Sequence, residues 1–337
     1  LSKIYPYSRL LKDNSIKEGI VALQIKDEKN INFEAFIKGL DLPLQKNDTN
    51  IDSLEINGKI EDGKTKISSK DEDIKIEIDD KLNIYLKNLD VILENNRIET
   101  TNLKQEVIIS LFNSKLKMDT DIYYLENAKI FIKNSGIDFE ADVKDLNLPI
   151  KKNNNKIEKL SLIGSLKNDT TFIETKNKDL ILQLTEDSVF LYAEDYALHY
   201  SSIDSKKIEN IKYKKIDIKG KNLIIFYDEV NKLLADEFVL RIRNDSKFVS
   251  LDYKQTSVSF RESKDKKIDI FSNNVSDEFI NALIGKHIFD GGNLMFYANG
   301  YMNNLNGKLI IENSNVEGVT ILNNLLLFIQ TSPALIN

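Results

Sequence analysis

The stretch Ile74–Leu86 reads IKIEIDDKLNIYL, and it decides the fold class. Its apolar residues recur at every second position before and after the triplet Asp79–Lys81. Successive side chains of a β-strand point to opposite faces of a sheet, so the stretch predicts two strands with one apolar face each. The polar triplet predicts a solvated turn between them. Because short connections join antiparallel neighbours, we expect an antiparallel hairpin.

The region around this hairpin occurs twice in the chain. Sliding the sequence by 106 positions, since 139 − 33 = 106, aligns Phe33–Ala35 with Phe139–Ala141 without a gap. The same offset aligns Asp73 with Asp179. Self-similarity at a fixed period is the sequence signature of repeat architectures, so we interpret this region as a duplicated β-unit.

The same alternation continues from Ile20 to about Phe271 and predicts roughly twenty strands. An open sheet of that many strands would be on the order of 100 Å long, and it must twist, curl or split. Ser276 followed by two acidic residues predicts a capped helix, and Val319–Gln330 is a second possible helix. We therefore predict a mainly β fold: an elongated, twisted antiparallel sheet, with one or two short helices near the C-terminus. Because one face is apolar along most of its length, the sheet must fold over itself or hold something apolar.

Four segments follow from this interpretation. Residues 1–127 hold the first β-repeat and its connecting strands, and residues 128–204 hold the second repeat, offset by 106 from the first. Residues 205–273 are further strands of the same sheet. Residues 274–337 combine a helix, strands and an apolar helix at the end of the sequence.

Composition narrows the classes of partner. The net charge is −6 with both signs interspersed, so no basic stripe is available for nucleic acid, which we exclude. The chain has no cysteine, which excludes disulfides and thiolate chemistry. No segment reaches the roughly 18 consecutive apolar residues of a membrane span. The sequence begins with Leu1 and has no signal pattern, so we expect a piece of a longer protein whose anchor lies elsewhere.

Catalytic signatures are not found in the sequence: it has no nucleophile elbow, zinc helix or phosphate loop. His199 and His287 are far apart in sequence, and we expect both to be structural. Asp71–Asp73 does not have the ligand spacing of a calcium loop and is interpreted as a solvated turn. Gly291 and its neighbour Gly292 are interpreted as turn glycines. The sequence thus predicts a protein that is not an enzyme and has no metal or cofactor.

The end of the sequence resembles a known family. Phe289–Leu294 contains two glycines before a strand pattern, Gly300 and Gly307–Ile311 follow, and the remainder is an apolar stretch that ends on Thr331-Ser332-Pro333. This order is similar to that of the AsmA-like proteins of Gram-negative envelopes, of the YhdP and TamB type. The resemblance implies a periplasmic protein, anchored in the inner membrane and reaching toward the outer membrane through segments outside this sequence.

The resemblance also implies that the elongated sheet forms a U-shaped groove. It further implies a role: a bridge-like protein that carries phospholipid acyl chains along this apolar β-groove. We predict that eleven residues of the two repeats help to line such a groove. They are Ile74, Ile76, Ile78, Leu82, Ile84, Leu86, Leu180, Leu182, Leu184, Phe190 and Tyr192. Two alternatives remain open. A closed β-scaffold of the envelope would show the same periodicity, because any sandwich core alternates in this way, and an envelope enzyme would need clustered carboxylates in a cleft.

Overall fold

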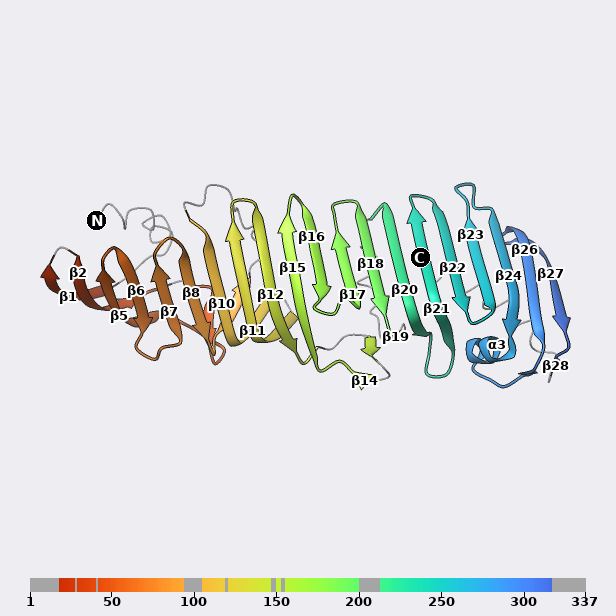
Figure 1. Cartoon of the computed structure of the whole chain (residues 1–337), viewed down its shortest axis with the longest axis horizontal. Helices are drawn as coiled ribbons and strands as arrows, with labels where there is room; N and C mark the ends of the chain where they lie inside the picture. Colours follow the sequence, from red (N-terminus) through yellow and green to blue (C-terminus); the bar gives the residue numbers. More distant parts are fainter. Residues whose placement is uncertain are drawn as a thin grey trace. The chain divides into compact units, whose positions relative to one another are not determined.

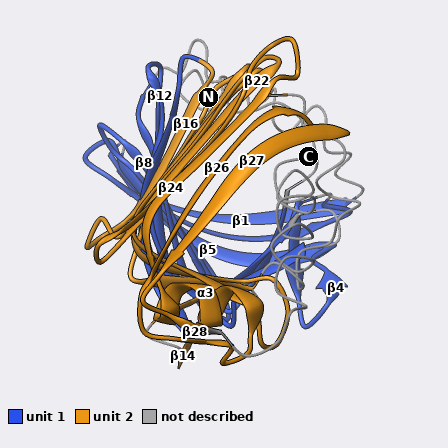
Figure 2. Ribbon diagram, turned by 90° about the vertical axis from the view of Figure 1, so that its right-hand side faces the viewer, with its two compact units in different colours: residues 1–146, 158–168 blue, residues 147–157, 169–337 orange. Residues whose placement is uncertain are grey.

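The computed structural model describes residues 18–27, 29–40, 42–93, 105–118, 121–146, 150–152, 155–199 and 213–316. Within these ranges the fold is mainly β with one α-helix, α3 (Asp277–Ile284), which confirms the predicted mainly β character. The chain divides into two compact units (Figure 2). The first holds residues 1–146 and 158–168, and the second holds residues 147–157 and 169–337.

The first unit is built from strands that lie side by side (Figure 1). They are β1 (Glu18–Asp27), β2 (Asn30–Lys38), β3 (Leu44–Lys46), β4 (Thr49–Asn50), β5 (Ser53–Glu61), β6 (Lys64–Ser69), β7 (Ile74–Ile78), β8 (Leu82–Lys87), β9 (Asp90–Leu93), β10 (Val107–Met118), β11 (Asp121–Lys133), β12 (Gly136–Lys144) and β15 (Lys159–Lys167). Their order across the sheet is β1, β2, β5, β6, β7, β8, β10, β11, β12, β15. Strands β8 and β9 pair with successive parts of β10, and β9 also pairs with β3.

The second unit repeats this plan and then extends it. Its strands are β13 (Ile150–Lys152), β14 (Asn155–Lys156), β16 (Thr170–Thr175), β17 (Leu180–Leu184), β18 (Ser188–Glu194), β19 (Tyr196–His199), β20 (Lys215–Phe226), β21 (Lys232–Arg243), β22 (Ser246–Tyr253), β23 (Thr256–Glu262), β24 (Ile268–Ser276), β25 (Phe289–Asp290), β26 (Asn293–Tyr301), β27 (Asn304–Glu312) and β28 (Asn315–Val316). Their order across the sheet is β16, β17, β18, β20, β21, β22, β23, β24, β26, β27.

The duplication inferred from sequence is a duplication of structure. Strand β2 (Asn30–Lys38) corresponds to β12 (Gly136–Lys144), shifted by 106 residues. The same shift relates β3 to β13, β4 to β14, β5 to β15, β6 to β16 and β7 to β17, and it holds for the first and the last residue of each strand. Equal strand lengths and equal connections follow from the repeated pattern of alternation and turn residues.

The sheets are not purely antiparallel. Hairpin neighbours are antiparallel, as predicted, but β10 runs parallel to β8 and β9, and β20 runs parallel to β18 and β19. Residues 94–106 separate β9 from β10, and residues 200–214 separate β19 from β20. A connection of a dozen or more residues can return the chain to the starting end of the sheet, which a tight turn cannot do.

Helix α3 confirms the prediction made from its acidic start. The Ser276 hydroxyl accepts a hydrogen bond from the Phe279 backbone N–H at 3.3 Å, and Gly285 closes the helix with φ +69°. Both are standard ways of satisfying the backbone groups at helix ends. The second possible helix, at residues 319–330, lies outside the described residues. In the described ranges no helix has the length and apolar character needed to cross a bilayer.

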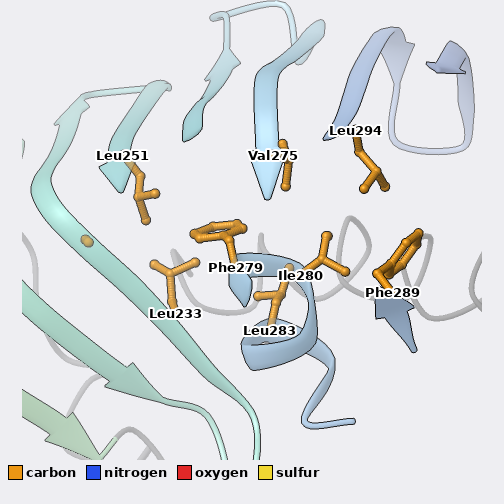
Figure 3. Packing of buried hydrophobic residues seen from close by; sticks show 9 residues of the cluster. Leu233, Leu251, Val275, Phe279, Ile280, Leu283, Phe289 and Leu294 are labelled. Carbon is orange, nitrogen blue, oxygen red and sulfur yellow. The ribbon is translucent and has the colours of Figure 1, made fainter. Parts of the chain in front are cut away.

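An apolar cluster fixes α3 to the second unit (Figure 3). The helix contributes Phe279, Ile280 and Leu283, each at most 6% exposed. They pack with buried side chains of β21, β22, β24, β25 and β26, which are Leu233, Ala235, Leu251, Val275, Phe289 and Leu294. Burying an apolar side chain of this size stabilises a fold by about 1.5–3 kcal/mol. Helix α3 therefore covers one end of several strands on one face of the sheet.

Candidate functional site

An unbroken row of apolar residues crosses the first unit from β1 to β15. Each residue lies directly opposite the next on the neighbouring strand, so all share one face of the sheet. This central row is Leu23, Phe33, Gly58, Ile67, Ile76, Ile84, Ile109, Ile130, Phe139 and Gly164. We call the face that carries it the apolar face and the opposite one the polar face.

A second row runs parallel to the central row, nearer the hairpin turns such as Asp79–Lys81. It is Ile25, Ile31, Ile60, Thr65, Ile78, Leu82, Val107, Ile132, Ile137 and Leu166. Thr65 is its one polar member. All six candidates from the first repeat, Ile74 to Leu86, therefore lie on one face, because Ile74, Ile76 and Ile78 are paired with Leu86, Ile84 and Leu82.

Burial varies across this face. Ile74 and Leu86 are 8% and 6% exposed and belong to a cluster with Leu44, Leu89 and Leu111. The central row is half-buried from β2 to β12. On β1, Leu23 is 62% exposed. The described residues thus bury the apolar face well around Ile74 and Leu86, and only partly along the central row.

Gly58 leaves space for an aromatic ring in the central row. A Cβ atom on Gly58 would lie 2.0 Å from the Phe33 ring, so no larger residue fits without displacing that ring. The repeat carries the same pair, with Phe139 opposite Gly164. The cross-strand Gly58 allows the Phe33 ring to lie over it, and a ring over a glycine restores packing that the glycine itself cannot supply.

The second unit has its own central row of apolar residues, again directly opposite one another. It is Ile173, Leu182, Leu191, Ile218, Leu240, Val249, Phe260, Ile270, Ala298 and Gly307. Only Leu182 among them was singled out from the sequence. The signal for the others was present as alternation within each strand, but it does not reveal which strands are neighbours.

Two predicted residues, Phe190 and Tyr192, lie on the polar face instead. Leu180, Leu182 and Leu184 share the apolar face, whereas Phe190 and Tyr192 are directly opposite Gln183 and Ile181 on the other face. The Tyr192 hydroxyl donates a hydrogen bond to Glu194 at 2.7 Å, and this bond raises the pKa of Tyr192 to about 12. The sequence-based assignment of these two residues does not hold in this register.

Phe190 and Tyr192 lie on the polar face because the turn between the paired residues of β17 and β18 has one extra residue. Ile78 pairs with Leu82 in the first repeat, whereas the equivalent Leu184 pairs with Val189 in the second. A shift of one residue moves every side chain of a strand to the other face. Strand β18 is apolar at most positions of both faces, so its sequence did not reveal the shift. Leu191 and Ala193, opposite Leu182 and Leu180, take the places that Phe190 and Tyr192 were expected to fill.

An ion pair between a partly exposed lysine and a buried aspartate occurs at the same place in both repeats. Lys46 lies 2.5 Å from Asp73, and the residues 106 positions later, Lys152 and Asp179, form the equivalent pair. Asp73 and Asp179 are 9% and 8% exposed, so Asp73 is not the solvated turn residue that we predicted. Lys46 also donates a hydrogen bond to Asp71, and this bond holds the pKa of Asp71 at about 2.

We expect Asp179→Asn to lower the free energy of unfolding by about 1–3 kcal/mol. Asp179 accepts hydrogen bonds from Thr175 at 2.6 Å and Tyr196 at 3.2 Å, and an amide in its place would turn a donor toward Lys152. Urea denaturation followed by circular dichroism measures the change. Asp187→Asn is the control, because Asp187 is 45% exposed and its ion pair with Lys215 is long, at 3.6 Å. This variant should change the free energy of unfolding by less than about 0.5 kcal/mol. Equal effects would contradict the prediction.

The two histidines have different surroundings. His199 stacks on Phe226 with ring centroids 4.6 Å apart, and burial lowers its pKa. His287 lies beside α3, with Nδ1 3.2 Å from the Asn281 side-chain nitrogen. No group of three or more histidine or carboxylate side chains that could hold a metal is found in the described part of the chain.

Comparison with known proteins adds no relative. No protein-family model, curated protein or solved structure matches this chain. Part of the C-terminal pattern that suggested the AsmA-like family has a local structural reason: Gly292 has φ +73°, and a Cβ there would lie 2.3 Å from the Glu312 carbonyl oxygen. Position 292 in this turn therefore requires glycine whatever the family.

Proposed function

We propose that this protein binds phospholipid acyl chains on its apolar face and carries them between the inner and outer membranes of a cell envelope. The observation that supports this most is the central row of the first unit, which has no polar side chain on any of the ten strands that it crosses between β1 and β15. Chain movement along a protein needs a lining without polar interruptions, because an unpaired polar group would hold water.

The partial exposure of the central row also favours a ligand. Its members from β2 to β12 are half-buried rather than buried, so apolar area remains for an acyl chain. Each CH₂ group removed from water contributes about 0.8 kcal/mol, so a long acyl chain could gain on the order of 10 kcal/mol before the costs of ordering it. In this proposal the apolar faces form a groove, no bond is broken, and no catalytic residue is needed.

The envelope setting of the proposal is based on the resemblance of residues 289–311 and 322–333 to the AsmA-like family. In this proposal the protein works in the periplasm, and segments other than those described make the contacts with the membranes. The nine predicted lining residues that share the apolar face within their own unit remain candidates: Ile74, Ile76, Ile78, Leu82, Ile84, Leu86, Leu180, Leu182 and Leu184.

Mass spectrometry of an organic extract tests the proposal. The protein is purified without detergent, and a soluble protein of similar size is processed in parallel. We expect phospholipid in near-stoichiometric amount in the extract of this protein and not in the control. An extract free of phospholipid, from protein that has been incubated with phospholipid vesicles, would overturn the proposal.

A closed structural scaffold is the second candidate. It is favoured by the buried clusters around α3 and around Leu89, where protein side chains already cover the apolar face. In that case the apolar faces would be filled entirely by the chain itself, and extracts would contain no lipid. The same experiment therefore separates the two candidates.

A further inference from the structure

The polar face of the second unit carries a group of aromatic and basic residues. Phe248 of β22 lies directly opposite Arg241 of β21 on one side and Arg261 of β23 on the other. The two guanidinium carbons are 5.9 Å and 5.8 Å from the Phe248 ring centroid. At these distances the ring face attracts both cations and holds them in place on the sheet.

Exposed aromatic residues continue this group on the next strands. Phe271 of β24 and Tyr297 of β26 are directly opposite each other on the same face, and they are 53% and 51% exposed. Lys308 of β27 is opposite Tyr297, and Lys219 of β20 is opposite Val239 of β21 on this face. We call the set Lys219, Arg241, Phe248, Arg261, Phe271, Tyr297 and Lys308 the basic aromatic patch.

The chain neutralises only part of the positive charge of the patch. Asp217, directly opposite Arg241, is bound by both oxygens to Arg243, at 2.7 Å and 2.6 Å. Asp269, directly opposite Arg261, accepts a hydrogen bond from the neutral amide of Asn299 and keeps its negative charge, so four basic side chains face one uncompensated carboxylate. Among the described residues no carboxylate forms an ion pair with the four basic side chains of the patch. In a chain of net charge −6, this leaves a local excess of positive charge that faces solvent.

We infer that the basic aromatic patch is a docking surface for an anionic lipid bilayer. Guanidinium groups match the geometry of phosphate oxygens, and exposed aromatic residues with an apolar body prefer the level of the lipid headgroups. An acidic protein would complement the charge, but it would not by itself account for a solvent-exposed Phe271 beside Tyr297. The inference concerns the polar face and does not depend on acyl chains binding to the apolar face.

Co-sedimentation of the full chain with lipid vesicles tests this inference. We expect binding to vesicles of phosphatidylcholine mixed with phosphatidylglycerol, weak binding to pure phosphatidylcholine, and loss of binding at high salt. Arg241→Gln with Arg261→Gln should lower the binding constant about tenfold or more, because each basic residue near an anionic surface contributes about 1 kcal/mol.

The matched control is Lys59→Gln with Lys66→Gln, which removes the same charge from the polar face of the first unit. The control variant should bind the mixed vesicles like the unchanged protein. An equal loss of vesicle binding in both variants would overturn the inference, and so would equal binding to both kinds of vesicle. Competition by soluble polyglutamate as effective as that by the mixed vesicles would also overturn it. Phospholipid extracted from the Arg241→Gln, Arg261→Gln variant should stay unchanged, so failure of this inference is distinguishable from failure of the proposed function.

Discussion

Phe289→Ala is expected to lower the free energy of unfolding of the second unit by about 3–5 kcal/mol, the usual cost of truncating a fully buried phenylalanine. Phe289 is 0% exposed and belongs to the cluster around α3. Its backbone is held on both sides by the Asn281 side chain, which accepts from the Phe289 N–H at 3.0 Å and donates to its carbonyl at 2.7 Å. The fixed backbone limits how far the chain can close the cavity.

Hydrogen exchange with mass spectrometry measures this loss and locates it. The chain has no tryptophan, so peptide-resolved exchange is more informative here than intrinsic fluorescence. Protection should fall in α3 and in β21 to β26 and stay unchanged in the first unit. Phe271→Ala is the control, because Phe271 is 53% exposed and on the polar face. A similar loss of protection in both variants would show that the cluster does not have the expected role.

Ile76→Asp is expected to abolish retention of phospholipid if the proposed function is correct. Ile76 is in the central row between Ile67 and Ile84, and an ionised carboxylate there would have to keep its water in the middle of an apolar face. Leu182→Asp makes the same change in the central row of the second unit. Phospholipid per protein, measured after incubation with vesicles, should fall at least tenfold in each variant.

Lys75→Asp is the matched control. Lys75 is the neighbour of Ile76 on the same strand, and its side chain is on the polar face and 48% exposed. This variant should retain phospholipid like the unchanged protein. Because Ile76→Asp could unfold part of β7, the milder Ile76→Gln and Leu182→Gln are measured beside it, together with circular dichroism. Folded variants that still retain phospholipid would exclude the apolar face as the binding site.

Particular elements explain why much of this fold could be predicted from sequence. The hairpin of β7 and β8 was predicted from the alternation in Ile74–Leu86, because side-chain direction depends only on local backbone geometry. Helix α3 was predicted from Ser276 and the acidic residues after it, because capping is satisfied within a few residues. The repeat offset of 106 was predicted without error, because similar sequences with similar turns form similar strands.

Three features were not predicted from the sequence. The ion pair between Lys46 and Asp73 joins the end of β3 to the turn before β7, so no local pattern indicates it. The parallel pairing of β10 with β8 depends on where a long connection returns the chain. The position of Phe190 depends on a single residue in the turn before β18. In the first two cases the free energy that decides the arrangement comes from contacts between segments far apart in the sequence. In the third it comes from the register of one hairpin, which moves every side chain of a strand when it shifts by one residue.

The sequence by itself therefore determined the kind of elements, their approximate ends, the duplication and the presence of one apolar face on most strands. These properties follow from the alternation of side chains along a strand and from turn and cap residues that act within a few positions. Only the tertiary structure decided which strands are neighbours, in what register, and which apolar residues join into the two central rows. Neighbours and register are set by packing and hydrogen bonds across the sheet, where a shift of one residue exchanges its two faces.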